Sequence, residues 1–146
     1  MKLSISNTLL LVLSFALCLS RPIFATDAPS NKSTQYVYTE QGEELIDGSQ
    51  SSITWTFILD ANNGAVVNIT SWHSPFSCNG KYKVITKGNE LHLYWLQKQN
   101  KDISCNVPSP QFILKKQDNS MLVKSDCFYY GEGKWFPLED KNRNKK

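Results

Sequence analysis

The chain has 146 residues, of which 40% are hydrophobic, 12% aromatic and 20% charged, and its formal net charge is +3. These values predict one small globular domain, because the chain is too short for two domains and too rich in aromatic residues for a disordered polymer. The sequence also has no heptad or Gly-x-y period, which excludes a coiled coil and a collagen-like repeat.

The N-terminal segment has the pattern of a secretory signal. Lys2 precedes an apolar run from Leu9 to Leu19, and a polar stretch with a proline leads to Ala25, after which we expect cleavage. The apolar run is shorter than the roughly 20 residues that a membrane-spanning helix needs. We therefore expect residues 1–25 to be removed and the mature protein to be secreted or periplasmic, with no stable membrane insertion.

The basic charge is concentrated outside the body of the predicted domain. Removal of residues 1–25 takes away Lys2 and Arg21, so the formal charge falls from +3 to +1. Much of the remaining basic charge lies in residues 139–146, which we interpret as a solvated tail. A nucleic-acid-binding protein normally carries a basic stripe across its fold, so we expect no nucleic-acid partner.

Three cysteines remain after the predicted cleavage: Cys78, Cys105 and Cys127. An exported chain meets oxidising conditions, so one disulfide and one spare thiol are expected. Pairing of Cys78 with Cys105 is favoured because the segment between them is predicted to form a hairpin that brings both ends to the same side. Pairing of Cys105 with Cys127 is the alternative. The spacings match no zinc pattern, so no metal site is predicted.

In chain order, the predicted elements begin after a polar leader. Residues 26–52 are interrupted by one proline and two glycines and are interpreted as a linker that could hold one short strand. From Ile53 to Leu59, large apolar side chains alternate with other residues and face one side. A second alternating run, Ala65 to Trp72, follows the turn-forming residues 60–64. Together these runs predict a β-hairpin.

The same pattern continues in the second half of the chain. Strands at Tyr82 to Ile85 and at Leu91 to Leu96 flank a turn and predict a second hairpin, and residues 97–110 are interpreted as a longer loop. The remaining predicted strands are Gln111 to Lys116, Met121 to Ser125, Phe128 to Tyr130, and Trp135 to Leu138.

These elements predict an all-β fold with little helix, since no stretch of the mature chain has apolar residues at helical spacing over three turns. Six to eight short strands joined by tight turns form an antiparallel meander. Such a meander hides its apolar face by closing into a barrel, with a β-sandwich as the alternative. We place the barrel domain at residues 53–138, between the polar leader and the basic tail.

The sequence offers little that suggests catalysis. The only local cluster is Trp72-His73-Ser74, with Cys78 close behind, and a disulfide at Cys78 would remove the nucleophile. The chain also has no phosphate-binding or dinucleotide-binding glycine motif. We therefore expect no catalytic residues, no cofactor and no enzymatic activity. A hydrolase that uses His73 is a weaker alternative.

The aromatic residues near the C-terminus suggest a binding surface. Most other aromatic side chains fall on the inward phase of predicted strands, whereas those around the Gly-Glu-Gly-Lys turn occupy both phases, which leaves some of them exposed. Exposed Tyr and Trp suit recognition of a partner protein, because they bury a large area at a small entropic cost. The predicted partner-binding residues are Tyr129, Tyr130, Glu132, Lys134 and Trp135.

A segment in the middle of the chain resembles a known group of proteins. Residues 77–84 (Ser-Cys-Asn-Gly-Lys-Tyr-Lys-Val), followed by Gly88, Leu91-His92-Leu93 and Cys105, are similar to the middle of small exported bacterial calycin-like β-barrel proteins. That group includes periplasmic lysozyme inhibitors, and similar exported barrels act as immunity proteins. The likeness covers about residues 50–138, but the chain has no Ser-Gly-x-x-Tyr segment of the kind those inhibitors use.

The resemblance implies that a loop blocks a target by entering its cleft. Together with the missing catalytic set, it leads us to expect an exported, non-enzymatic protein that inhibits or neutralises a cell-envelope hydrolase or a toxin through protein–protein contact. The alternative is a small lipocalin-like carrier that holds an apolar ligand inside its barrel. Short strands favour a filled interior and so favour the first hypothesis.

Overall fold

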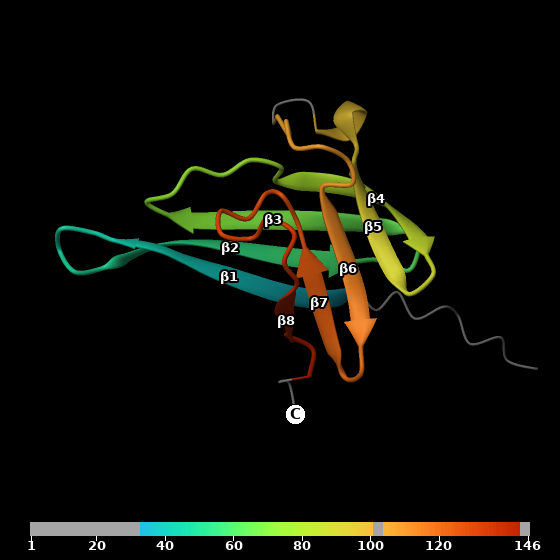
Figure 1. The fold of residues 1–146 in the computed structure, drawn as a ribbon. Coiled ribbons are helices and arrows are strands. Elements are labelled where there is room, and N and C mark those ends of the chain that lie inside the picture. The colour runs from blue at the N-terminus through green and yellow to red at the C-terminus, as the bar shows by residue number, and fades with distance from the viewer. Residues whose placement is uncertain (1–32, 101–103, 144–146) are drawn as a thin grey trace, which may run out of the picture. The chain divides into compact units, whose positions relative to one another are not determined.

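The computed structural model describes residues 33–100 and 104–143, and the predicted signal segment lies outside them. The described chain is all-β with a single turn of 3-10 helix, and its strands close into an antiparallel barrel, as the sequence predicts (Figure 1). The elements are β1 (Thr34–Glu44), β2 (Gln50–Leu59), β3 (Gly64–Trp72), β4 (Gly80–Lys87), β5 (Glu90–Trp95), η1 (Gln97–Gln99), β6 (Phe112–Gln117), β7 (Ser120–Lys124) and β8 (Phe136–Asp140).

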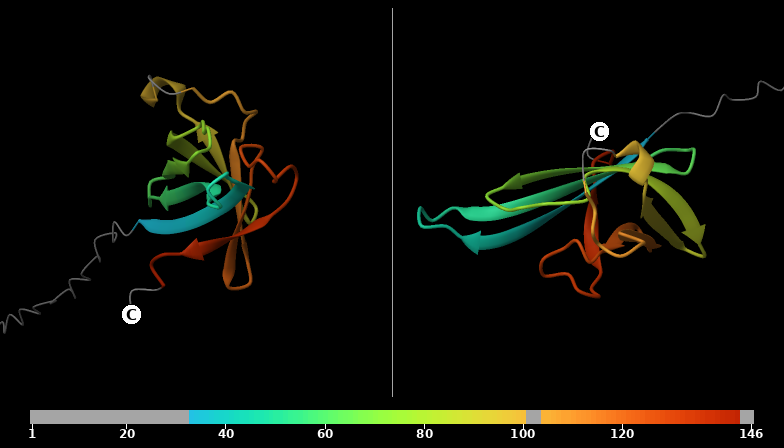
Figure 2. Two further views of the ribbon diagram at one scale, coloured as in Figure 1. Left: turned by 90° about the vertical axis from the view of Figure 1, so that its left-hand side faces the viewer. Right: turned by 90° about the horizontal axis from the view of Figure 1, so that it is seen from above.

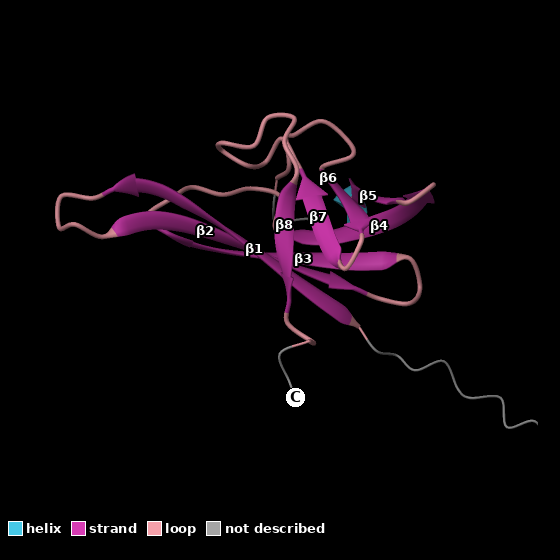
Figure 3. Ribbon diagram, turned by 60° about the horizontal axis from the view of Figure 1, so that its bottom comes forward, coloured by secondary structure: helices cyan, strands magenta, loops and turns pink. Residues whose placement is uncertain are grey.

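Each strand pairs with the next one in sequence, and β1 pairs with β8 to close the barrel. Because strand direction alternates, the β1–β2, β3–β4, β5–β6 and β7–β8 connections share one end of the barrel, here named the loop end. Most of them are long, whereas tight turns join the strands at the opposite turn end (Figure 3). The loop end therefore holds most of the irregular chain that can form a site.

The β1–β2 hairpin extends beyond the barrel wall. Pairing of β1 with β8 is limited to Tyr36 with Asp140 and Val37 with Glu139, whereas its pairing with β2 continues to Glu44 opposite Gln50. Figure 2 shows the hairpin reaching past the other strands at the loop end. One wall of the loop end is consequently taller than the rest.

The barrel interior is filled by side chains from alternate positions of the strands, as the period-two pattern predicts. Trp55 and Phe57 of β2 are almost fully buried, and the partly buried Ile53 and Leu59 on the same face pack against the core. The largest fully buried side chains are those of Trp55, Tyr82, Phe57, Phe112, Leu93, Leu114, Val67, Val123 and Cys78.

The barrel differs from the sequence-based boundaries at both ends. β1 lies in the range 26–52 that was interpreted as a leader, and β8 runs to Asp140, inside the predicted tail. The inward face of β1 presents Tyr36 and Tyr38 and then the carboxylate of Glu40, so its apolar alternation is too short to stand out. Its strand conformation is supported by pairing with β2 and β8. The pairing with β8 joins distant parts of the chain, so the local sequence pattern does not predict it.

One predicted strand is a loop in the structure. Residues 128–130 form turns and not a strand, and β8 begins at Phe136, one residue after the predicted start at Trp135. The aromatic residues at 128–130 have high strand propensity, so the sequence predicts a strand there. Turn-forming residues on both sides determine the backbone conformation instead.

A disulfide joins Cys78 in the β3–β4 loop to Cys105 in the β5–β6 loop, which confirms the favoured pairing and leaves Cys127 free. The bond is compatible with an extracellular or periplasmic protein. No helix among the described residues has the length and apolar character needed to cross a membrane.

Candidate functional site

The β7–β8 connection, residues 125–135, is here named the tyrosine loop. Phe128 turns into the barrel, where it is 4% exposed and its ring centroid lies 4.7 Å from that of Tyr38 and 4.8 Å from that of Trp55. The next two side chains, Tyr129 and Tyr130, are 78% and 49% exposed, with ring centroids 4.8 Å apart. One buried aromatic residue thus anchors a pair of exposed ones.

Glycines allow the tyrosine loop to turn tightly after this anchor. A Cβ atom on Gly131 would lie 2.5 Å from the Cβ of Phe128, so a larger residue would force the backbone apart. The backbone N–H of Lys134 donates to the carbonyl of Gly131 at 2.9 Å, and Gly133 has a φ of +71° that favours glycine. The two glycines therefore permit the tight turn that follows Phe128.

A buried carboxylate from β1 fixes the tyrosine pair. Glu40 is only 7% exposed, and its two oxygens accept hydrogen bonds from the backbone N–H groups of Tyr129, at 3.0 Å, and Tyr130, at 2.9 Å. A carboxylate that accepts two backbone donors forms stronger bonds than a neutral acceptor would. β1 and the tyrosine loop are thus tied together although they lie about 90 residues apart in sequence.

A groove of about 290 Å³ lies between the β1–β2 hairpin, the β3–β4 loop and the tyrosine loop. Its lining includes Glu40, Glu43, Leu45, His73, Tyr129 and Tyr130. The hairpin wall supplies the carboxylates and the tyrosine loop supplies the aromatic rings. The groove is therefore an open site with acidic and aromatic components.

Exposed apolar side chains are concentrated at the same end of the barrel as this groove. Six large hydrophobic residues are exposed in the described part of the chain, and all but Ile85 belong to connections or strand ends at the loop end. A concentration of exposed aromatic surface is unusual for a soluble domain and is typical of an interaction site. The loop-end residues are Ile46, Trp72, Phe76, Tyr129 and Tyr130.

The structure separates the five residues predicted to bind a partner. Tyr129 and Tyr130 line the groove, whereas Glu132 and Lys134 are exposed on the same loop outside its lining. Trp135 is half-buried, with its ring centroid 4.4 Å from the ammonium group of Lys115 and 5.0 Å from that of Lys124. Two cation–π contacts thus occupy Trp135 on the β6–β7 side of the barrel.

Sequence reasoning missed several residues of the site. Trp72 could have been found, because it falls on the same strand phase as the exposed Asn68 and Thr70. Phe76 and Ile46 lie in irregular segments where no alternation exists to mark them. The role of Glu40 depends on a contact with a distant loop, so no local signal indicates it.

The groove also contains His73 and Ser74, the residues of the alternative hydrolase hypothesis. Cys78 is engaged in the disulfide, and burial raises the pKa of the Cys127 thiol to about 11. Neither sulfur therefore offers a thiolate nucleophile at neutral pH. Among the residues that the structure describes, no three His, Cys, Asp or Glu side chains are grouped to hold a metal ion.

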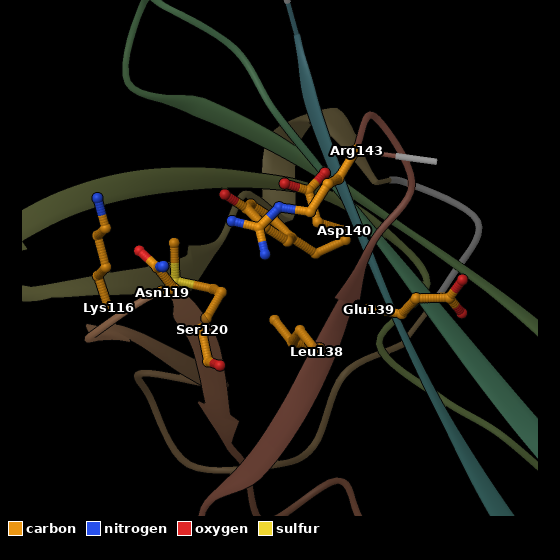
Figure 4. A pocket seen from close by; sticks show the side chains of 9 residues that line it. Lys116, Asn119, Ser120, Leu138, Glu139, Asp140 and Arg143 are labelled. Atoms are coloured by element: carbon orange, nitrogen blue, oxygen red, sulfur yellow. The ribbon is translucent and has the colours of Figure 1, made fainter. Parts of the chain in front are cut away.

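A second cavity of about 290 Å³ lies at the turn end and involves β1, β8 and the β6–β7 turn (Figure 4). Both charge signs line it, since Lys116 and Arg143 are basic and Asp140 is acidic. Figure 4 shows Arg143 near Asp140, with Lys116 set apart from both. Burial, with a smaller effect of Asp140, raises the pKa of Tyr36 in this cavity. The turn-end cavity is thus mixed in charge, unlike the groove.

Comparisons with protein-family models, with curated proteins and with solved structures gave no match to this chain. The geometry of the site is therefore the basis on which a function can be proposed for the chain.

Proposed function

We propose that this chain is an exported, non-enzymatic binding protein that inhibits or neutralises another protein, with a cell-envelope hydrolase or a toxin as the target class. The observation that carries the proposal is the exposed aromatic pair Tyr129 and Tyr130, which lines the groove at the loop end of the barrel. Tyr and Trp side chains contribute a large share of the binding energy at protein interfaces.

The way in which the tyrosine pair is held supports this proposal. Phe128 anchors the loop in the core, and Glu40 binds the backbone of both tyrosines. A binding loop that is ordered before contact loses less entropy on association than a disordered one does. The geometry thus suits a rigid projection that enters a cleft of the target.

The packing of the interior weighs against the alternative carrier. The side chains of Trp55, Phe57, Tyr82 and Phe112 are each less than 2% exposed. The ring of Phe112 contacts those of Phe57 and Tyr82, with centroids 5.2 Å and 5.6 Å away. An apolar ligand of ordinary size would have to displace these rings from a packed core.

Affinity capture from an envelope extract of the native host tests the proposal. The wild-type chain is expected to retain a partner protein and to reduce the activity of a captured hydrolase or toxin. The double variant Tyr129→Ser/Tyr130→Ser is expected to lose at least tenfold in retention, because truncation of interface aromatic residues commonly costs about 2 kcal/mol or more.

The matched control for this capture is Ile85→Ser, which removes an exposed large apolar residue that lies on β4, away from the loop end. It is expected to retain the partner as the wild type does. Equal loss in both variants, or full retention in the double variant, would contradict the proposed contact surface.

A further inference from the structure

Charge is distributed unevenly between the two halves of the barrel. Residues 33–80, which contain β1, β2, β3 and the β3–β4 loop, carry five acidic residues and no Lys or Arg. Residues 81–100 and 104–143 carry ten Lys or Arg and six acidic residues. The small net charge of the whole chain therefore conceals an acidic segment on one side of the groove. Residues 33–80 are here named the acidic wall.

Most of the acidic wall belongs to the β1–β2 hairpin. Its acidic side chains are those of Glu40, Glu43, Glu44 and Asp47, and none of them forms an ion pair with another residue in the described part of the chain. A register shift between Gln41 and Glu44 interrupts the alternation of the strand, and Glu43 lines the groove there. The groove thus has negative charge that no described cation neutralises.

The same groove presents aromatic rings next to these carboxylates. Tyr129 and Tyr130 supply ring faces, and Leu45 and Ile53 supply apolar surface, so the lining combines three kinds of contact. The side chain of Arg or Lys matches all three. Its charged head pairs with a carboxylate, its aliphatic stem packs on apolar surface, and its cation is attracted to an aromatic face.

From this complementarity we propose that the groove receives an arginine or lysine side chain from an extended, positively charged segment of the partner protein. Glu43 pairs with the cation, and the tyrosine pair flanks its stem. Arginine is the better fit, because its planar guanidinium group binds a carboxylate and an aromatic ring at once. This inference rests on the proposed function, since it names the chemistry of the partner at the same site.

The test is an NMR titration of the purified, isotope-labelled chain with the blocked peptide acetyl-Ala-Arg-Ala-Arg-Ala-amide. The expected result is a set of shifts confined to amides of Glu43, Leu45, His73, Tyr129 and Tyr130. The matched peptide with citrulline in place of arginine has the same shape without the charge, and it is expected to bind at least fivefold more weakly. Raising the salt concentration is expected to weaken binding of the arginine peptide.

Two variants separate the groove from the general acidity of the protein. Glu43→Gln is expected to weaken binding of the arginine peptide about two- to fivefold, the range for an exposed charge pair. Glu44→Gln removes the same charge from the neighbouring, exposed position of the hairpin outside the groove lining, and it is expected to leave binding unchanged. Equal effects of the two variants, equal binding of both peptides, or shifts spread over the whole acidic wall would each overturn the inference.

Failure of this inference is distinguishable from failure of the proposed function. Capture of a partner that depends on the tyrosine pair but not on Glu43 or on salt would overturn the cationic segment and leave the proposed function standing. Suppose instead that the arginine peptide binds in the groove, but that the double variant Tyr129→Ser/Tyr130→Ser captures the partner as well as the wild type does. That result would support the cationic site and contradict the proposed contact surface.

Discussion

Glu40 is the residue on which the geometry of the site depends most. Buried carboxylates are costly unless hydrogen bonds satisfy them, and here two backbone N–H groups of the tyrosine loop do so. The same two bonds satisfy donors of the loop that no strand partner satisfies. A single side chain of β1 thus determines where Tyr129 and Tyr130 stand.

Substitution Glu40→Gln is expected to loosen the tyrosine loop. The amide keeps one acceptor oxygen but loses the charge, and its NH₂ group faces one of the two backbone N–H groups from which Glu40 accepts hydrogen bonds. The free energy of unfolding should therefore fall by about 2 kcal/mol. Hydrogen exchange should accelerate at the amides of Tyr129 and Tyr130. Glu44→Gln, at an exposed position of the same strand, serves as the control, and an equal effect there would contradict the assigned role of Glu40.

The free thiol of Cys127 predicts a pH dependence of stability. Burial is the largest cause that raises its pKa from 9.0 to about 11, so the folded state holds the thiol proton more tightly than the unfolded state does. The resulting stabilisation is complete below pH 9 and is lost as the pH rises toward 11. By pH 10 the loss should reach about 1 kcal/mol.

Urea unfolding at pH 8 and at pH 10 measures this loss, and Cys127→Ala should make the difference between the two pH values smaller. The pKa of Tyr38 is raised further, to about 12, so its own contribution is lost mainly above this window. An unchanged pH dependence in Cys127→Ala would show that the thiol is not protected by burial.

At the scale of elements, the β3–β4 and β5–β6 loops are held to the barrel by asparagine side chains as well as by the disulfide. The side chain of Asn100 accepts from the N–H of Lys81 at 2.9 Å and donates to its carbonyl at 2.8 Å, as a neighbouring strand would. Asn79 accepts from the N–H of Ile69 at 2.8 Å. Gly80 is required there, because a Cβ atom would lie 2.4 Å from the Asn100 side chain.

Removal of the disulfide by Cys78→Ala/Cys105→Ala should lower the free energy of unfolding by about 3 kcal/mol. The bond closes a loop of 27 residues, and the broken loop gains entropy in the unfolded state. The measurement is the urea midpoint, with Cys127→Ala as the matched single-thiol control. A loss no greater than that of Cys127→Ala would mean that the asparagine contacts alone hold the two loops.

The elements with regular alternation were predictable from sequence, and those that depend on distant contacts were not. The run from Ile53 to Leu59 predicts β2, because the alternation of apolar with other residues is visible within the run itself. β1 escapes the same reasoning because Glu40 interrupts its apolar face. The site divides in the same way: Tyr129 and Tyr130 follow from an aromatic turn, whereas their juxtaposition with the β1–β2 hairpin arises only when β1 and β8 close the barrel.

At the scale of the whole described barrel, the two ends have different properties. The loop end carries the exposed aromatic cluster and the acidic groove, whereas the cavity at the turn end has both charge signs. A packed aromatic core between them holds the loop end as a rigid platform. The loop end is thus the surface that we propose a partner contacts.

Site-specific photo-crosslinking in the native host tests this organisation most directly. The photoreactive analogue p-benzoylphenylalanine is placed at Tyr129 in one variant and at Ile85 in the other, so both positions carry the same probe. We predict a covalent adduct with one partner protein from position 129 and none from position 85. The same adduct from both positions, or no adduct from position 129, would contradict the account.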